Sequence, residues 1–223
     1  RMGIKPFYYS LSDKAINFAS NTQALLTQNI DKSINPVALQ QQLSLHGVVP
    51  APNTIINGVR KMRPATTITI GKNGKLIEKT YWQPVAKRPR KKLSDGEYIE
   101  KTHELLTEAV MKRMQAAAVP IGVLLSVGLA SSLLVVLLHE AGHQDIRTFS
   151  IGFEDIDDEA GSEFEYSDQI VEKFNTQHEK YVVSNAEVLP RLSEAVANMA
   201  EPMVGQDAVA FYLLSEQVSK HIK

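Results

Sequence analysis

Near the middle of the chain, one stretch joins an apolar run to an apolar helix: Leu124-Leu125-Ser126-Val127-Gly128-Leu129-Ala130-Ser131-Ser132. The apolar run Val119–Leu125 leads into it and predicts a strand that is buried on both faces. An apolar helix is predicted from about Ser131 to Glu140. Small residues between a strand and a helix let a phosphate approach backbone N–H groups, where the helix dipole favours an anion. The hydroxyls of Ser126 and Ser131 add hydrogen-bond donors, so the loop is a candidate phosphate site. An ordinary strand-to-helix turn with a serine N-cap fits the same residues.

Further strands and helices alternate on both sides of this loop. Ser94–Glu97 and Ser184–Glu187 each have the pattern of a capping box, which predicts a helix start. Ile146–Phe153 and Glu179–Val183 read as strands, with a helix over 162–175 between them. A last helix is predicted from about Asp207. The helix after Ser184 places five apolar residues on one face: Val188, Leu192, Ala195, Val196 and Met199. This alternation predicts an α/β fold with a parallel, doubly wound sheet.

The first half of the chain has the signals of short strands and turns. Phe7–Tyr9 and Phe18–Ser20 predict two strands, and Asn35-Pro36 predicts a helix with an asparagine N-cap. Thr66–Ile70 and Leu76–Tyr81 predict a hairpin around an Asn-Gly turn. Two prolines and five basic residues in 84–92 predict an extended, exposed linker.

Composition excludes several function classes. The 223 residues carry a net charge of −1, so no general attraction to nucleic acid is expected. The absence of cysteine excludes a thiolate metal site and a cysteine nucleophile within these residues, and it fits a cytoplasmic protein. Apolar runs such as Leu133–Leu138 are far shorter than the roughly 20 residues of a membrane-spanning helix.

The central loop resembles the pyrophosphate loop of the ATP pyrophosphatase superfamily, whose pattern is Ser-Gly-Gly-x-Asp-Ser. The similarity to asparagine synthetases continues, in the family's order, through most of the chain. The stretches that carry it are Arg1–Tyr9, Phe18–Ser20, Tyr81-Trp82, Val119–Ser126, Thr148–Phe153, Thr176–Glu179 and Glu201–Met203. A looser resemblance links Pro64–Thr66, 163–168 and Val209–Ser215 to the bacterial N-acetylglutaminylglutamine amidotransferases.

The resemblance implies a division of the chain and a reaction. Residues 1–83 would be the end of an α+β Ntn-type glutaminase domain, 84–94 a basic linker, and 95–223 the start of an ATP-pyrophosphatase-type synthetase domain. The glutaminase would release ammonia from glutamine, and the synthetase would use ATP and Mg²⁺ to adenylate a carboxylate substrate. Ammonia would then displace AMP and leave an amide. A homodimer is possible. The carboxylate substrate that accepts the ammonia is either aspartate or a glutaminylglutamine-type dipeptide.

The same resemblance assigns the site residues. Ser126, Gly128 and Ser131 would hold the pyrophosphate, with Val127 between them, while Leu125 and Ile151 would line the adenine pocket. Two positions depart from the family pattern. Val127 stands where the pattern has Gly, and a β-branched side chain resists the backbone conformation of a tight loop. Ala130 stands where the pattern has Asp, which removes an oxygen ligand for magnesium.

These departures lead to an expectation about activity. By the resemblance, the family's nucleophilic cysteine would lie upstream of Arg1, and its second phosphate loop would lie downstream of Lys223. Both ends of the sequence therefore look cut. We expect this chain neither to hydrolyse glutamine nor to complete amide synthesis. A catalytically dead remnant that binds nucleotide or a partner is the alternative. A third hypothesis is a tRNA-modifying or sulfur-transferring enzyme of the superfamily. Two features argue against it: the glutaminase-like first half and the lack of cysteine.

Other candidate sites have plainer readings. His139-Glu140-Ala141-Gly142-His143 matches the zinc-protease pattern, but Gly142 is expected to end the helix and carry His143 off it. The acidic run Glu154–Glu159 is expected to be a solvated loop. His178 is expected to be a structural histidine with its hydrogen bonds satisfied.

Overall fold

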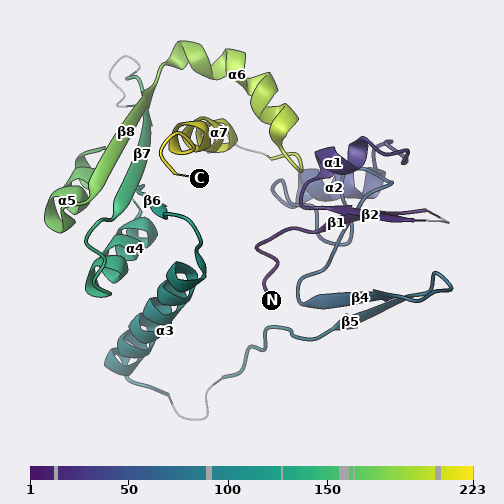
Figure 1. Cartoon of the computed structure of the whole chain (residues 1–223), viewed down its shortest axis with the longest axis horizontal. Coiled ribbons are helices and arrows are strands. Elements are labelled where there is room, and N and C mark those ends of the chain that lie inside the picture. Colours follow the sequence, from purple (N-terminus) through teal and green to yellow (C-terminus); the bar gives the residue numbers. More distant parts are fainter. Residues whose placement is uncertain are drawn as a thin grey trace. The chain divides into compact units, whose positions relative to one another are not determined.

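The structure is a computed structural model that describes residues 1–12, 15–88, 92–126, 128–155, 161–162, 164–203 and 207–222. The chain divides into two compact units (Figure 1). Unit 1 holds Arg1–Arg88 together with Glu194–Gly205, and unit 2 holds Pro89–Ser193 together with Gln206–Lys223. The chain therefore passes from unit 1 to unit 2, returns, and leaves again.

Unit 1 contains a small antiparallel sheet, a separate hairpin and two helices. The sheet has the order β2-β1-β3, and β4 pairs with β5 in the hairpin. The elements are β1 Tyr8–Leu11, β2 Ile16–Ala19, α1 Thr22–Leu26, α2 Pro36–Ser44, β3 Arg60–Lys61, β4 Thr66–Ile70 and β5 Leu76–Thr80. Its core consists of Tyr8, Leu25 and Val59, and Ala200 of the returning segment packs against it.

Local signals set the boundaries of these elements. The Asn35 side chain accepts hydrogen bonds from the N–H groups of Val37 and Ala38 at 3.0 and 3.1 Å, so the predicted N-cap of α2 is confirmed. Gly74 has a φ of +75°, which suits glycine in the turn between β4 and β5. Between Tyr81 and Arg88 the described chain has neither helix nor strand, as predicted for the linker.

Unit 2 is built on a parallel sheet of order β6-β7-β8. Its elements are α3 Asp95–Ala116, β6 Gly122–Leu124, α4 Leu129–Glu140, β7 Arg147–Phe153, α5 Phe164–Phe174, β8 Gln177–Val183 and α7 Asp207–Val218, together with the first part of α6 Asn185–Asn198. The capping box of α3 forms as predicted, with the Glu97 carboxylate accepting from the Ser94 N–H at 2.8 Å. Helices α5 and α7 lie on opposite sides of the sheet (Figure 1). The α/β fold and the parallel pairing agree with the prediction.

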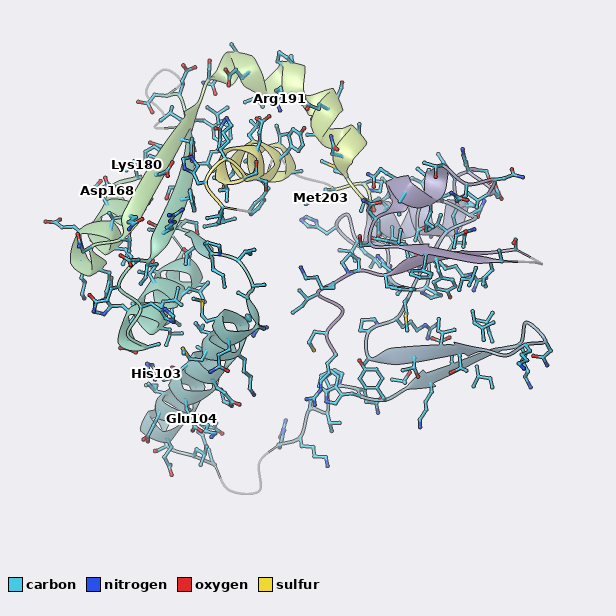
Figure 2. The ribbon with its side chains drawn as sticks, in the orientation of Figure 1. His103, Glu104, Asp168, Lys180, Arg191 and Met203 are labelled. Carbon is cyan, nitrogen blue, oxygen red and sulfur yellow. The ribbon has the colours of Figure 1, made fainter. Side chains whose placement is uncertain are left out.

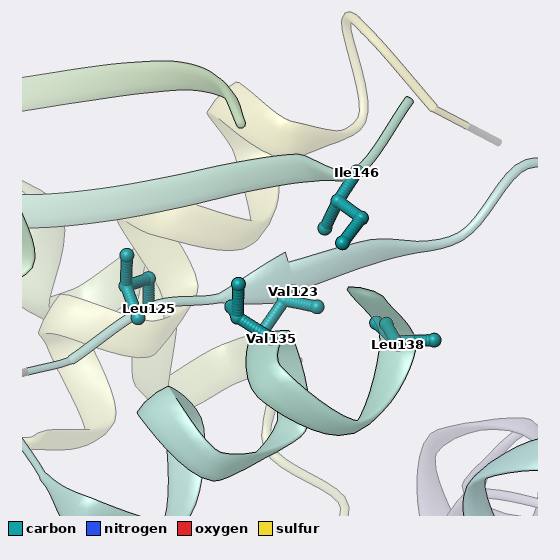
Figure 3. Close-up of a cluster of buried hydrophobic side chains, with 5 residues drawn as sticks. All are labelled: Val123, Leu125, Val135, Leu138 and Ile146. Carbon is teal, nitrogen blue, oxygen red and sulfur yellow. The ribbon is translucent and has the colours of Figure 1, made fainter. Parts of the chain in front are cut away.

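The core of unit 2 fills the space between the sheet and α4. Five buried residues form it: Val123, Leu125, Val135, Leu138 and Ile146 (Figure 3). Side chains of α3 and α5 pack around this cluster. The ion pair between Asp168 of α5 and Lys180 of β8, at 2.6 Å, lies on the surface of the same side (Figure 2).

The prediction that Val119–Leu125 is a strand buried on both faces was wrong. Strand β6 is only three residues long and has one strand neighbour, β7, among the described residues. Val123 is 6% exposed because it points into the core, whereas Leu124 is 41% exposed because its side of β6 opens onto a cavity. An apolar run cannot by itself show that one face lines a cavity.

The helix predicted after Ser184 is confirmed as α6, but its surroundings differ from those of a helix packed on one core. Of the five residues on its predicted apolar face, only Ala195 is buried, because α6 is divided between the two units and does not lie along one core. At its start, the Ser184 hydroxyl accepts from the Ala186 N–H at 3.4 Å. Glu154, which follows β7, adds a second cap, because its carboxylate accepts from the Ser184 hydroxyl at 2.9 Å and from the Asn185 N–H at 3.0 Å.

Candidate functional site

Hydrogen bonds made by Ser126 and Ser131 hold the loop between β6 and α4 together. The Ser131 hydroxyl accepts a hydrogen bond from the Ser126 N–H at 3.1 Å and lies 3.0 Å from the Ser126 hydroxyl. It is also within hydrogen-bonding distance of the carbonyl oxygens of Ser126 (2.9 Å) and Gly128 (3.0 Å). The Gly128 N–H donates to the Ser126 Oγ at 3.3 Å. Val127 lies outside the described residues.

Helix α4 begins directly after this loop. Its N-cap is Gly128, which provides no side-chain cap, so the serine N-cap considered from the sequence does not form. The first N–H groups of a helix have no partner within the helix and carry partial positive charge. Ala130 is exposed in this first turn. The N-terminal end of α4 is therefore suited to binding an anion.

A first cavity, of about 480 Å³, lies beside the carboxyl ends of β6 and β7. We call it the serine cavity. Its described lining residues are Leu125, Ser126, Gly128, Ser150, Ile151, Gly152, Phe153, Gly161, Ser162, Phe164 and Ser167. Seven of these eleven residues are serine or glycine, so hydroxyl and backbone groups are available to a polar or anionic group.

A second cavity, of about 270 Å³, adjoins the other side of the same strand ends. We call it the α7 cavity. It is lined by Leu124, Leu125, Ser126, Phe149, Ser150, Ile151, Ala210, Phe211 and Leu214. This lining is largely apolar and includes one aromatic ring from α7, as expected of a site for a flat ring. Four residues line both cavities: Leu125, Ser126, Ser150 and Ile151.

Close packing holds the wall of the serine cavity in place. The Ser150 hydroxyl donates to the Leu125 carbonyl at 2.5 Å and ties β7 to the end of β6. A Cβ added at Gly152 would lie 2.5 Å from the Ser162 Cβ and 2.8 Å from the Phe164 ring. Glycine is therefore required at this position, because β7 and the start of α5 approach closely there.

The structure brings together most of the residues predicted for the site. Leu125, Ser126, Gly128 and Ile151 line the cavities, while Ser131 is 9% exposed and its hydroxyl is turned into the loop. The sequence prediction did not include Ser150, Ser162 or the α7 residues. An alternating hydroxyl in β7 could have indicated Ser150, but no local signal connects α7 to a loop about 80 residues earlier in the chain.

The lining residues do not fit a protein-held magnesium ion. No carboxylate is among the described residues that line either cavity. The described part of the chain also contains no group of three or more His, Cys, Asp or Glu side chains that could hold a metal ion. Ala130 occupies the first turn of α4 with a methyl group where a carboxylate ligand was expected.

His178 lies on β8 beside the buried Thr148 of β7. Its Nδ1 is 2.8 Å from the Thr148 hydroxyl, whereas its buried Nε2 has no hydrogen-bond partner among the described residues. The expectation of a fully satisfied histidine was therefore wrong, because the hydroxyl reaches only one ring nitrogen. Burial, and then the charge of Lys180, lowers the pKa of His178 below its ordinary value.

The zinc-protease pattern does not form a site. Helix α4 ends at Glu140 and Gly142 has a φ of +88°, so the predicted helix end is confirmed. His139 packs edge-on against Phe174, and Glu140 pairs with His103 at 2.9 Å. In the acidic run, Glu154 caps α6 and Asp155 accepts from the Gly161 N–H at 2.8 Å, and the remaining acidic residues lie outside the described residues.

No helix in the described ranges combines the length and the apolar character that crossing a membrane requires.

Fold and site together define an α/β protein with a ligand-type cavity at the carboxyl ends of parallel strands, next to a helix N-terminus. The family described as asparagine synthase matches residues 101–223, and a glutamine amidotransferase domain matches residues 1–82. The chain belongs to the asparagine synthase family.

Two curated relatives illustrate the similarity. Asparagine synthetase [glutamine-hydrolyzing] 1 of Bacillus subtilis (strain 168) is 28% identical over 220 residues, which are 99% of this chain and 34% of that protein. Putative asparagine synthetase [glutamine-hydrolyzing] 2 of Methanocaldococcus jannaschii is 30% identical over 230 residues, 100% of this chain and 42% of that protein. The chain thus spans well under half the length of these relatives.

Proposed function

We propose that this chain supplies the ATP-binding part of a glutamine-hydrolysing, ATP-dependent amide ligase. The observation that carries the proposal is the pair of adjoining cavities at the strand ends, one rich in serine and glycine and the other largely apolar. A nucleotide has the same two-part chemistry, a charged phosphate chain and a flat base. The two family matches support the joining of this site to a glutaminase.

The proposed domains follow the sequence. Residues 1–83 form the end of an Ntn-type glutaminase domain, 84–94 a linker, and 95–223 the beginning of an ATP-pyrophosphatase-type domain. The whole protein adenylates a carboxylate with ATP, and ammonia from glutamine displaces AMP to give the amide. The acceptor is aspartate or, if the subgroup resemblance holds, a glutaminylglutamine-type dipeptide. We place the protein in the cytoplasm, with a homodimer as its possible assembly.

Within the site, the backbone of Ser126 and Gly128 and the hydroxyl of Ser126 face the pyrophosphate. Ser131 acts indirectly, because its hydroxyl makes hydrogen bonds within the loop and so sets the shape of the loop. Leu125 and Ile151 contact the adenine together with Phe211 of α7. Electrostatic stabilisation of phosphate charge is the main contribution that such a loop makes to adenylation.

A second candidate function is a nucleotide-binding or partner-binding module without catalysis. The absence of a carboxylate from the described lining favours it, because phosphate charge then lacks a protein-held metal. The N–H groups of Ser126 and Gly128 are also already bonded within the loop. A phosphate must displace these internal bonds, which weakens binding.

Titration calorimetry with ATP tests the proposal, with Ala130→Asp as the informative variant. The added carboxylate repels ATP when EDTA removes magnesium, and it helps to hold Mg²⁺ when the metal is present. We expect the parent chain to bind Mg-ATP weakly. The variant should bind Mg-ATP about 10-fold more tightly than the parent, the equivalent of one added charge-assisted contact, and should bind free ATP less tightly.

Ala130→Asn is the matched control, because it has the same shape without the charge. If Asp and Asn behave alike in both conditions, position 130 does not face a metal-bound phosphate. If neither the parent nor Ala130→Asp binds Mg-ATP, the nucleotide proposal fails and a partner-binding role is left.

A further inference from the structure

The peptide bond between Leu125 and Ser126 joins the parallel sheet of unit 2 to the candidate phosphate loop. Strand β6 ends at Leu124, but its pairing with β7 continues for one more bond, because the Leu125 N–H donates to the Phe149 carbonyl at 2.8 Å. The Leu125 side chain belongs to the core cluster that also contains Val123 (Figure 3). The side chain and the N–H of Leu125 are therefore held by the core and the sheet.

A side chain of β7 holds the remaining group, the Leu125 carbonyl. The Ser150 hydroxyl donates to this carbonyl at 2.5 Å, and the two residues are 4% and 2% exposed. A buried carbonyl that loses its donor carries the cost of an unmade hydrogen bond. Leu125 and Ser150 both line the serine cavity and the α7 cavity. Without the hydroxyl, the carbonyl is therefore expected to turn toward a cavity, where water can reach it.

The orientation of this carbonyl decides where the next N–H points. A trans peptide is planar, and its C=O and N–H point in opposite directions. The peptide between Leu125 and Ser126 is trans. With the carbonyl bonded to β7, the Ser126 N–H points away from β7 and donates to the Ser131 Oγ at 3.1 Å, in the first turn of α4. A hydroxyl of the sheet thus sets the direction of an amide in the loop.

A second buried hydroxyl of β7 offers a comparison. Thr148 is 0% exposed, and its hydroxyl lies 2.9 Å from the Thr176 hydroxyl and 2.8 Å from the His178 Nδ1. These bonds connect β7 with the chain at the start of β8. None of the three residues is among the described residues that line the two cavities. Thr148 therefore stabilises the sheet alone, whereas the Ser150 hydroxyl reaches the loop.

We propose that Ser150 is a positioning residue of the nucleotide site. Its hydroxyl holds the Leu125 carbonyl and so keeps the Ser126 N–H directed at the N-terminal end of α4, where a phosphate oxygen can accept from it. A donor that already points at the developing or bound charge needs no reorganisation when the ligand arrives. The inference rests on the proposed function for the identity of the ligand, but the orientation of the peptide does not depend on it.

The test uses the 223-residue chain labelled with ¹⁵N, and nuclear magnetic resonance titrations with Mg-ATP and with adenosine. Ser150→Ala removes the hydroxyl. We expect it to weaken Mg-ATP binding about 5-fold, the effect of one lost hydrogen bond. Adenosine has no phosphate, so its affinity should change less than about 2-fold. Ser150→Thr keeps the hydroxyl and should restore the affinity for Mg-ATP.

Thr148→Val is the matched control, because it also removes a buried hydroxyl from β7. It should leave both affinities unchanged. Ser150→Cys, whose thiol is a weaker donor, carries the test if Ser150→Ala does not fold, and it should also weaken Mg-ATP binding selectively. A purely structural role gives one of two results, and either overturns the inference. Ser150→Ala would weaken the binding of both ligands alike, or it would weaken Mg-ATP binding no more than Thr148→Val does.

Failure of the proposed function gives a different pattern. If the parent chain does not bind Mg-ATP, the chemical shift of the Ser126 amide proton without ligand still decides the orientation of the peptide. Loss of the bond to Ser131 should move this proton upfield in Ser150→Ala and not in Thr148→Val. Equal shifts in the two variants would refute the inference, whether or not the chain binds ATP.

Discussion

Strands β7 and β5 show two ways in which a strand is held in this molecule. Strand β7 is covered on both faces, and its neighbouring residues Thr148 and Phe149 are 0% and 1% exposed. Strand β5 is exposed along its whole length, and its Ile77 is 56% exposed. The first strand is stabilised by burial, whereas the second depends on its hydrogen-bonded ladder with β4 and on the turn that joins them.

This difference explains where the candidate site lies. Cavities with defined walls form at the ends of β6 and β7, where strands, helices and the loop are packed against one another. Strand β5 lines neither of these two cavities. The comparison can be tested by substitutions that remove burial or strain the turn.

Replacing Phe149 by alanine should have the largest effect. The ring is buried between β7 and neighbouring elements, so the loss of its contacts and the cavity left behind cost about 3–5 kcal/mol. Ile77→Ala on β5 should change stability by less than about 0.5 kcal/mol. Urea unfolding followed by circular dichroism measures both. Similar losses for the two variants would remove the distinction between the strands.

Adding a methyl group at Gly152 should have the next largest effect. The new Cβ would overlap Ser162 and Phe164, so β7 and α5 must separate at a cost of about 1–3 kcal/mol. Gly74→Ala on the hairpin meets no atom within 4 Å and is strained only by its φ of +75°, which costs about 1–2 kcal/mol.

The two glycine variants should differ in location as well as size. Hydrogen exchange should rise in β7 and α5 for Gly152→Ala, and only in β4 and β5 for Gly74→Ala. An effect of Gly74→Ala on β7 would show that the hairpin supports more than itself.

The smallest effect should be a pH dependence that arises from His178. Its pKa is lowered in the folded state, chiefly by burial, so the unfolded state binds more protons between that lowered pKa and the ordinary value of 6.5. Stability should therefore rise with pH through this window and be lost as pH falls below 6.5. His178→Gln should flatten the dependence, measured as the urea midpoint against pH. His103→Gln, on the exposed face of α3, is the control, and an equal flattening there would contradict the assignment.

Much of the local structure could be predicted because it depends on neighbours in the sequence. Asn35 caps α2, Ser94 and Glu97 cap α3, and Gly74 forms the hairpin turn, as their patterns indicated. Part of the candidate site could be predicted for the same reason, since Ser126 and Gly128 form a loop between a strand and a helix. The inward turn of Ser131 could not, because it depends on the exact path of the loop.

The sequence by itself determined the alternation of strands and helices in unit 2, its parallel sheet and the loop between β6 and α4, because periodicity, caps and turns act over a few residues. The family came from the resemblance of the chain to known sequences. Only the tertiary structure decided that Leu124 faces a cavity, that α7 forms its wall, and that Glu201 meets Lys61 across 140 residues. The physical reason is that burial and ion pairing depend on which distant segments pack together, and no local pattern records that.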